Sequence, residues 1–271
     1  MVIRVRNEAD SLRAVLHALS VQNHQPIDLV VVDNASTDGS REVAESCGAR
    51  VLHISKEEFT YGRALNRGMD AAQAESVVVM SAHALPLSRD FLERAVEPFQ
   101  DPRVAGVRCL HAGNRKELNL WMEARRLDSK SSLNQVVSYG PVACACAIRK
   151  SVWQAVPFDE EVTAVEDKLW ALKVLQQGYF IANSEALYLY TRDIGFFESI
   201  KKMNRDRLEF FRRTGVEWQE PPVSLARLLV SILYDAPRRV LRTVAKETLL
   251  YLHLRTITLQ ARRNQKIGSV R

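Results

Sequence analysis

Three polar clusters in the N-terminal third of the chain each follow a short apolar run, and their side chains are of types that bind ligands. The clusters are Asn7-Glu8, residues 33–38 and residues 81–83. A carboxylate such as that of Asp33, at the end of a strand, can accept hydrogen bonds from a nucleobase or a ribose. A neutral imidazole such as that of His83 is a good ligand for Mn²⁺ or Zn²⁺. The structural alternatives are a capped strand-to-helix turn for residues 33–38 and an inert loop histidine.

A fourth polar cluster, Glu166-Asp167, stands where a helix is predicted to begin. Acidic side chains in the first turn of a helix are stabilised by the helix macrodipole, which is a sufficient structural reason for the pair. A chemical role is the alternative, and the two residues alone do not decide between them.

Alternating strands and helices are predicted to position the first three clusters. Apolar runs predict strands over residues 2–5, 27–32, 50–54, 77–80 and 104–110, with helices between them near 10–19, 40–46, 62–74 and 88–99. This order predicts an α/β protein with an open, mostly parallel sheet flanked by helices. Ligands bind at the carboxyl ends of the strands in such sheets, so we expect the clusters to form one site.

The regular alternation ends after Leu110. Residues 111–138 are polar and are predicted to be mostly loop, with one amphipathic stretch near 118–127. A strand over 142–148, a helix near Val165 and one or two strands within 179–190 follow, and from Phe196 the pattern is helical to about residue 263. We expect a first domain over 1–192, with halves 1–110 and 111–192, and a helical extension over 193–271.

The composition of the 271 residues, 46% hydrophobic and 26% charged, is that of an ordinary soluble protein. No uncharged apolar run reaches the roughly 18–20 residues that span a bilayer, and Met1 does not begin a secretory leader. The four cysteines are too few and too irregularly spaced for a disulfide framework. We therefore expect a reduced, cytoplasmic compartment.

The basic character belongs to the C-terminal quarter. Residues 200–271 hold 16 Lys and Arg against 6 Asp and Glu, whereas residues 1–199 hold 22 against 26. Apolar positions on one side of a predicted helix precede basic ones: Leu225, Leu228, Leu229 and Ile232, then Arg238, Arg239, Arg242 and Lys246. This pattern fits a packed helical layer, or a peripheral segment on an anionic membrane surface. No nucleic-acid-binding module is recognisable, so we expect no nucleic-acid partner.

Taken in order, the motifs resemble the family 2 glycosyltransferases of the GT-A fold, most of all bacterial enzymes of surface polysaccharides, including rhamnosyltransferase-like members. The matching segments are Asn7-Glu8, residues 31–40, 62–68, 81–83 and 166–170. The resemblance covers about residues 1–192. It implies an inverting transfer of a sugar from a nucleotide-diphosphate sugar donor to a hydroxyl group of a glycan or lipid-linked acceptor.

The resemblance also implies roles for individual residues. The nucleotide-sugar would be bound by Asn7, Glu8, Asp33, Ser36, Arg63, Asn66 and Ser81. Asp167 would be the base that deprotonates the acceptor, supported by Glu166. Residues 81–83 stand where the family carries its Asp-x-Asp element, so His83 would hold a divalent cation, Mn²⁺ or Mg²⁺, on the diphosphate.

The altered Asp-x-Asp element leaves two alternatives open. Arg63 or another cation could balance the diphosphate without a metal ion, or the chain could be a non-catalytic nucleotide-sugar-binding protein on a GT-A scaffold. The acids at 166 and 167 favour an enzyme, because a binding scaffold needs none there. A dinucleotide-dependent dehydrogenase is a distant third alternative, because no G-x-G-x-x-G motif follows the first strand.

Overall fold

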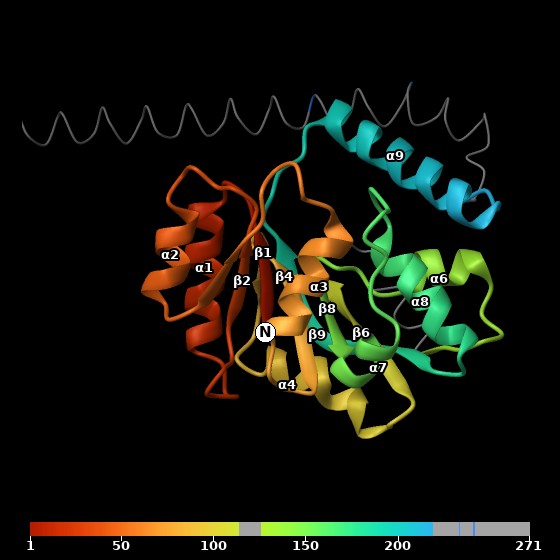
Figure 1. Ribbon diagram of the computed structural model, residues 1–271, viewed down its shortest axis with the longest axis horizontal. Helices are drawn as coiled ribbons and strands as arrows, with labels where there is room; N and C mark the ends of the chain where they lie inside the picture. Colours follow the sequence, from red (N-terminus) through yellow and green to blue (C-terminus); the bar gives the residue numbers. More distant parts are fainter. Residues whose placement is uncertain (114–125, 219–232, 234–240, 242–271) are drawn as a thin grey trace, which may run out of the picture. The chain divides into compact units, whose positions relative to one another are not determined.

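The computed structural model describes residues 1–113 and 126–218, together with the single positions 233 and 241. Within these residues the strands form one mixed sheet in the order β3-β2-β1-β4-β8-β6-β9-β5, with β7 paired to β9. The strands are β1 (Val2–Val5), β2 (Val30–Asp33), β3 (Arg50–His53), β4 (Ser76–Ser81), β5 (Ala84–Pro86), β6 (Val104–His111), β7 (Arg126–Leu127), β8 (Ala145–Arg149) and β9 (Phe180–Tyr190). The predicted α/β class is confirmed (Figure 1).

The first four strands of the chain pair in parallel. β1 lies between β2 and β4, and β3 extends the sheet beyond β2. β8 then pairs antiparallel with both β4 and β6, and β9 runs parallel to β6. The parallel half therefore collects the carboxyl ends of its strands at one edge. The side chains of β1, β2 and β4 are almost all buried on both faces, which explains their continuous apolar runs.

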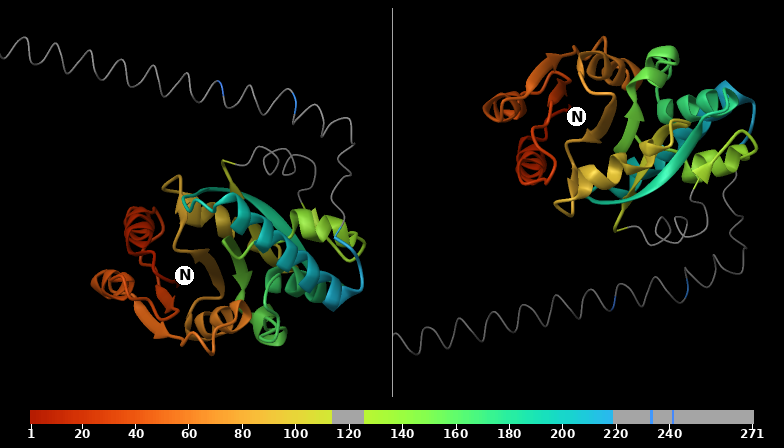
Figure 2. Two further views of the ribbon diagram at one scale, coloured as in Figure 1. Left: turned by 90° about the horizontal axis from the view of Figure 1, so that it is seen from above. Right: turned by 90° about the horizontal axis from the view of Figure 1, so that it is seen from below.

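Helices cover both faces of the sheet (Figure 2). They are α1 (Ala9–Ser20), α2 (Ser40–Ser46), α3 (Tyr61–Ala71), α4 (Phe91–Val96), the 3₁₀ turn η1 (Glu97–Gln100), α6 (Leu133–Tyr139), α7 (Lys150–Ala155), α8 (Glu166–Gln176) and α9 (Phe196–Thr214). One core cluster packs α1, α2 and α4 on the sheet, and a second packs α3, α7 and α8 on the other face. Helices α1 to α4 correspond to the helices predicted near residues 10–19, 40–46, 62–74 and 88–99.

Two glycines let α3 approach its neighbours closely. A Cβ atom on Gly68 would lie 2.3 Å from Cγ1 of Val2 on β1, and one on Gly62 would lie 2.1 Å from the carbonyl oxygen of Asp159. Both distances are shorter than any tolerated contact, so Gly68 allows the C-terminal half of α3 to pack on β1, and Gly62 allows its first turn to approach the segment before α8.

The structure differs from the sequence-based expectation in its short elements. β5, β7, α6 and α7 were not predicted, and β2 begins at Val30, not at residue 27. α6 had a readable signal, because Ser132 and Gln135 form a capping box at its start. Of the amphipathic stretch predicted at 118–127, only the two residues of β7 lie within the described part of the chain.

The chain forms two compact units, residues 1–218 and 219–271. The first unit includes α9 and so extends past the predicted boundary at residue 192. The predicted basic helices over 225–246 fall in the second unit, where the pattern residues lie outside the described positions. None of the helices in the described residues has the length and apolar character to cross a bilayer.

Candidate functional site

Three of the predicted clusters lie together at the carboxyl edge of the parallel strands. The register pairs Val5 with Asp33 and Arg4 with Ser81, so the loops after β1, β2 and β4 start at the same level. Asn7-Glu8, residues 33–38 and residues 81–83 stand in these three loops. The sheet topology thus assembles one site from segments that are separate in the sequence.

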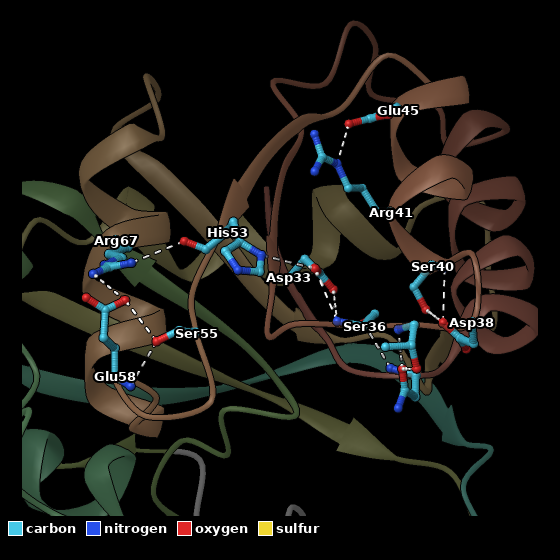
Figure 3. Close-up of polar contacts among 12 residues, drawn as sticks. Asp33, Ser36, Asp38, Ser40, Arg41, Glu45, His53, Ser55, Glu58 and Arg67 are labelled. Carbon is cyan, nitrogen blue, oxygen red and sulfur yellow. Dashed lines mark hydrogen bonds and ion pairs between the residues drawn. The ribbon is translucent and has the colours of Figure 1, made fainter.

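Asp33 closes one side of this edge (Figure 3). Its side chain is 3% exposed, both carboxylate oxygens accept from the backbone N–H of Ser36 at 3.3 Å, and Nδ1 of His53 lies 3.6 Å from Oδ2. Asn7 ties the neighbouring loop to this turn, because its Oδ1 accepts from Thr37 N at 2.7 Å and its own N–H donates to Ser36 Oγ at 3.0 Å. The loops after β1 and β2 therefore form one hydrogen-bonded unit.

Backbone strain is concentrated beside the predicted site residues. In residues 1–113 and 126–218, the non-glycine positions with positive φ are Asn7 at 51°, Ala35 at 49° and Val165 at 60°. A β-branched residue such as valine is the least favoured there, at a cost of roughly 1–3 kcal/mol. Val165 directly precedes Glu166 and Asp167 at the start of α8. Strain of this kind persists where the surrounding structure enforces it, as at functional sites.

A pocket of about 810 Å³ opens at this edge. Four predicted site residues line it: Ser81, His83, Glu166 and Asp167. The acids at the start of α8 are thus brought to the loop that follows β4. The remaining wall comes mainly from Arg4, Tyr61, Tyr190, Arg192 and one side of α9.

The two acids of the pocket have different surroundings. Asp167 is half-buried; its Oδ2 accepts from Ala143 N at 2.8 Å and its Oδ1 accepts from Lys168 N at 2.7 Å. Glu166 is fully buried beside Arg4, whose Nη1 lies 3.5 Å from Oε1. Burial, and then the charge of Asp167, raise the pKa of Glu166 to about 7, although Arg4 opposes the shift. One acid is held in a fixed orientation and the other binds a proton near neutral pH.

His83 is held by Glu8. The ring atom Nδ1 lies 2.9 Å from both carboxylate oxygens of Glu8, and the ring packs edge-on against Tyr190 with centroids 4.7 Å apart. Arg192 Nη1 lies 3.4 Å from Oε1 of the same carboxylate. With the proton on Nδ1, the Nε2 lone pair is left for a ligand, and a carboxylate in this place is the usual support of a metal-binding imidazole.

The described residues offer few protein ligands for a cation. No group of three His, Cys, Asp or Glu side chains suited to a metal ion occurs in the described ranges. His83 would therefore be a single protein ligand, and phosphate oxygens and water would have to supply the others, as they commonly do for Mg²⁺.

Arg63 and Asn66 are turned toward the protein and do not line the pocket. Arg63 Nε donates to Glu160 Oε2 at 3.0 Å. The amide of Asn66 donates to Glu160 Oε1 and to the carbonyl of Phe158, and its Oδ1 accepts from Trp153 Nε1 and from Phe158 N. These contacts fasten the segment before α8 to α3.

Several pocket residues were missed by the sequence analysis. Arg4 had a signal, since it is the one charged residue in the buried strand Val2–Val5. Tyr61, Tyr190 and Arg192 carry no motif, and the basic residues of α9 were assigned to a separate extension. Their common location depends on how α9 lies at the sheet edge, which no local pattern encodes.

Comparison with known proteins yields one family. The model described as "Glycosyl transferase family 2" matches residues 1–154. The O-antigen chain rhamnosyltransferase WbaN of Salmonella anatum is 28% identical over 178 residues, which cover 61% of this chain and 56% of that protein. The O-antigen chain rhamnosyltransferase RfbN of Salmonella typhimurium is 25% identical over 196 residues, 67% of this chain and 62% of that protein. The match thus spans less than two thirds of the length of either relative.

Solved structures share the fold. A mannosyltransferase from Pyrobaculum calidifontis in complex with GDP-Man and Mn²⁺ superposes with a TM-score of 0.64 at 21% identity, covering 84% of this chain and 66% of that chain. Glucosyl-3-phosphoglycerate synthase from Mycobacterium tuberculosis with Mg²⁺ and UDP gives 0.60 at 20% identity, with coverage of 79% and 78%. The predicted GT-A fold is confirmed by these likenesses.

Proposed function

The chain belongs to glycosyl transferase family 2, and from this premise we propose that it transfers a sugar from a nucleotide-diphosphate sugar to an acceptor hydroxyl group, with inversion. The observation that carries the proposal is the Asp167 carboxylate, which backbone N–H groups hold in a fixed orientation in the same pocket as His83. A pocket with a positioned base and an adjoining site for a leaving group suits a direct displacement.

Asp167 acts as the general base in this proposal. Each of its oxygens accepts one backbone hydrogen bond, which orients the carboxylate and leaves further lone pairs for the acceptor hydroxyl proton. No protein nucleophile is needed, because the nucleoside diphosphate is itself the leaving group. Glu166 supports this site through its contact with Arg4.

The donor is assigned to the carboxyl edge of the parallel strands. Asp33, Ser36 and Asn7 would bind the nucleoside, and Glu8 and Ser81 would stand beside the diphosphate. Arg63 and Asn66 would fasten the segment before α8 to α3 and would not contact the donor. Of these residues only Ser81 lines the pocket, and the others are proposed from their place at the carboxyl edge or on α3.

A divalent cation would be held by His83 with support from Glu8. When bound, it would neutralise charge on the departing diphosphate. Solved structures of similar fold hold Mn²⁺ or Mg²⁺. Because His83 would be the single protein ligand, we expect this protein to bind the ion well only together with a nucleoside diphosphate.

The acceptor is proposed to be a glycan or a lipid-linked glycan of a bacterial surface polysaccharide, because the relatives named above are O-antigen chain rhamnosyltransferases. A lipid-linked acceptor fits the basic residues over 225–246, which would hold the protein at the cytoplasmic face of an anionic membrane. Co-sedimentation with phosphatidylglycerol vesicles, and its loss at high salt, tests the membrane contact.

A thermal-shift screen against nucleotide sugars, followed by a transfer assay with the stabilising donor, tests the activity. The proposal expects release of the nucleoside diphosphate by the wild type and not by Asp167→Asn. The alternative, a non-catalytic nucleotide-sugar-binding protein, is favoured by the altered element at Ser81 and His83. Binding of a donor without any turnover, in the presence of candidate acceptors and Mn²⁺, would select that alternative.

A further inference from the structure

Two basic residues of the pocket lie outside residues 1–154, the part of the chain that the family model matches. They are Arg192, which follows β9, and Lys202 on α9, and both line the pocket together with Ser81 and His83. We refer to this pair as the basic wall. We propose that Lys202 and Arg192 bind a phosphate or diphosphate group inside this pocket. The inference deepens the proposed function and rests on it, since the proposed donor is one source of such a group.

Lys202 lines the same pocket as Cys144. Burial raises the pKa of the Cys144 thiol to about 11, and positive charge from Arg4 and, to a smaller extent, from Lys202 opposes that rise. Cys144 lines the pocket floor, where its carbonyl accepts from Ser81 N at 2.9 Å. Lys202 on α9 and Ser81 at the end of β4 therefore line one space.

Among the residues that the structure describes, no acidic side chain pairs with Lys202. Its neighbours on α9 are paired, Lys201 with Glu198 at 2.8 Å and Arg205 with Asp206 at 3.2 Å. Lys202 itself makes no ion pair or hydrogen bond with another residue of the described ranges. An uncompensated ammonium that faces a pocket, next to other cations, favours an anionic ligand.

Arg192 lines the same pocket from the segment that follows β9. Its Nη1 lies 3.4 Å from Oε1 of Glu8, a carboxylate that is shared with His83. The guanidinium makes no hydrogen bond to any other part of the chain that the structure describes, so most of its five N–H donors are available. A guanidinium fork matches phosphate oxygens in pairs.

The floor of the pocket adds a third positive group. Arg4 Nη2 donates to Ala143 O, and its guanidinium lies 5.2 Å from the ring centre of Tyr61. Its Nε and Nη1 atoms are buried without a hydrogen-bond partner in the described residues. Three cations from β1, from the segment after β9 and from α9 therefore surround one space, which fits a group with two or more negative charges.

The test compares variants of the full chain by calorimetric titration with inorganic pyrophosphate and with UDP, GDP and dTDP. Lys202→Ala and Arg192→Ala should each weaken binding by roughly 10-fold or more, the loss expected for one charge-assisted hydrogen bond. Lys202→Arg should retain most of the affinity. Arg212→Ala is the matched control, because Arg212 is an exposed cation of α9 that pairs with Glu209 and does not line the pocket.

Two measurements show whether the bound phosphate belongs to the donor or to the acceptor. If Lys202→Ala has a weaker affinity for the nucleoside diphosphate, the basic wall binds the donor. An unchanged affinity, together with weaker binding of inorganic phosphate to protein already saturated with nucleoside diphosphate, assigns the basic wall to a phosphate on the acceptor.

The inference is overturned if both alanine variants bind every phosphate probe as the wild type does, if the wild type binds none of them, or if Arg212→Ala loses as much affinity. If all variants bind nucleoside diphosphate as the wild type does and transfer activity is intact, Lys202 and Arg192 do not bind a phosphate group. The proposed function is then unaffected. If the protein binds no nucleoside diphosphate but binds pyrophosphate through Lys202, the proposed donor is wrong. The phosphate-binding role of the basic wall is then supported.

Discussion

Arg4 Nη1 lies 3.5 Å from Oε1 of Glu166, so the first strand of the sheet meets the first turn of α8 at the floor of the pocket. The same guanidinium donates through Nη2 to the carbonyl of Ala143, whose own N–H donates to Oδ2 of Asp167. Arg4 is therefore connected to both acids, directly to one and through one residue to the other. The predictions below start from this arrangement.

Asp167→Asn should lower the transfer rate by roughly 10²–10⁴-fold, the contribution of a general base, while donor affinity stays close to the wild-type value. The amide has nearly the shape of the carboxylate but cannot take the proton of the acceptor. Steady-state rates and calorimetric titration with the nucleoside diphosphate measure the two quantities. Asp193→Asn, which alters an exposed acid of the same pocket, is the control and should transfer normally. Near-normal turnover of Asp167→Asn would remove this residue from the mechanism.

Glu166→Gln should change how stability depends on pH. The folded protein holds the Glu166 proton up to about pH 7, whereas the unfolded chain releases it near 4.5. Since the native state binds more protons in this window, its contribution to stability falls as pH rises from about 4.5 to 7. Glutamine does not titrate, so the variant should gain stability relative to wild type between pH 5 and pH 8. Denaturant unfolding at both values tests this, and parallel pH profiles would contradict the raised pKa.

Asp33→Asn should weaken nucleoside diphosphate binding and leave the chemical step unchanged in protein that is saturated with donor. A charge-assisted hydrogen bond is worth about 1.5–3 kcal/mol, roughly 10- to 100-fold in affinity. Asparagine keeps the shape of this buried position and one acceptor for the Ser36 N–H. Calorimetric titration measures the affinity. Wild-type affinity in the variant would show that Asp33 only closes the turn after β2.

Removing the metal ion should reduce transfer, and Mn²⁺ should restore it better than Mg²⁺, because an imidazole ligand suits transition metals and Mg²⁺ prefers oxygen. His83→Ala should lose the stimulation, and His83→Asp should shift the preference toward Mg²⁺. Glu8→Gln should weaken Mn²⁺ binding by roughly 10- to 100-fold through the loss of ligand support. Mn²⁺ binding is followed by electron paramagnetic resonance in the presence of the nucleoside diphosphate. Activity that persists in excess chelator would contradict a metal role for His83.

Asn66→Ala should destabilise the fold without changing the affinity for nucleoside diphosphate. The substitution leaves the Trp153 Nε1–H and the Phe158 N–H without their acceptor, at a cost of about 1–3 kcal/mol for each donor that stays buried. Denaturant unfolding measures the loss. Arg67→Ala on the same helix is the control, because its partly exposed side chain pairs with Glu58 and donates to the carbonyl of His53 and does not bond Trp153 or Phe158 in the described residues. Unchanged stability with lost affinity would instead show direct contact between Asn66 and the donor.

The sequence alone predicted the α/β class, the parallel half of the sheet and the meeting of three polar clusters at its edge. These features are local: apolar runs such as Val30 to Val32 and helical periodicity are written in neighbouring residues, and parallel pairing then fixes which ends meet. The order of the motifs also led to the family. The GT-A fold and family membership were confirmed, whereas the roles of individual residues stay predictions.

The partners of the site residues were decided by the tertiary structure. Whether Asn66 faces a ligand or Phe158, and whether Glu166 meets water or Arg4, depends on contacts between residues that are far apart in the chain. The raised pKa of Glu166 has the same origin, since burial and the charge of a neighbour act through space. α9, which the sequence pattern assigned to an extension, forms a wall of the pocket because side chains such as Phe210 pack beside Val165 and Leu169. Packing of this kind depends on the shape of the folded surface, which no short stretch of sequence encodes.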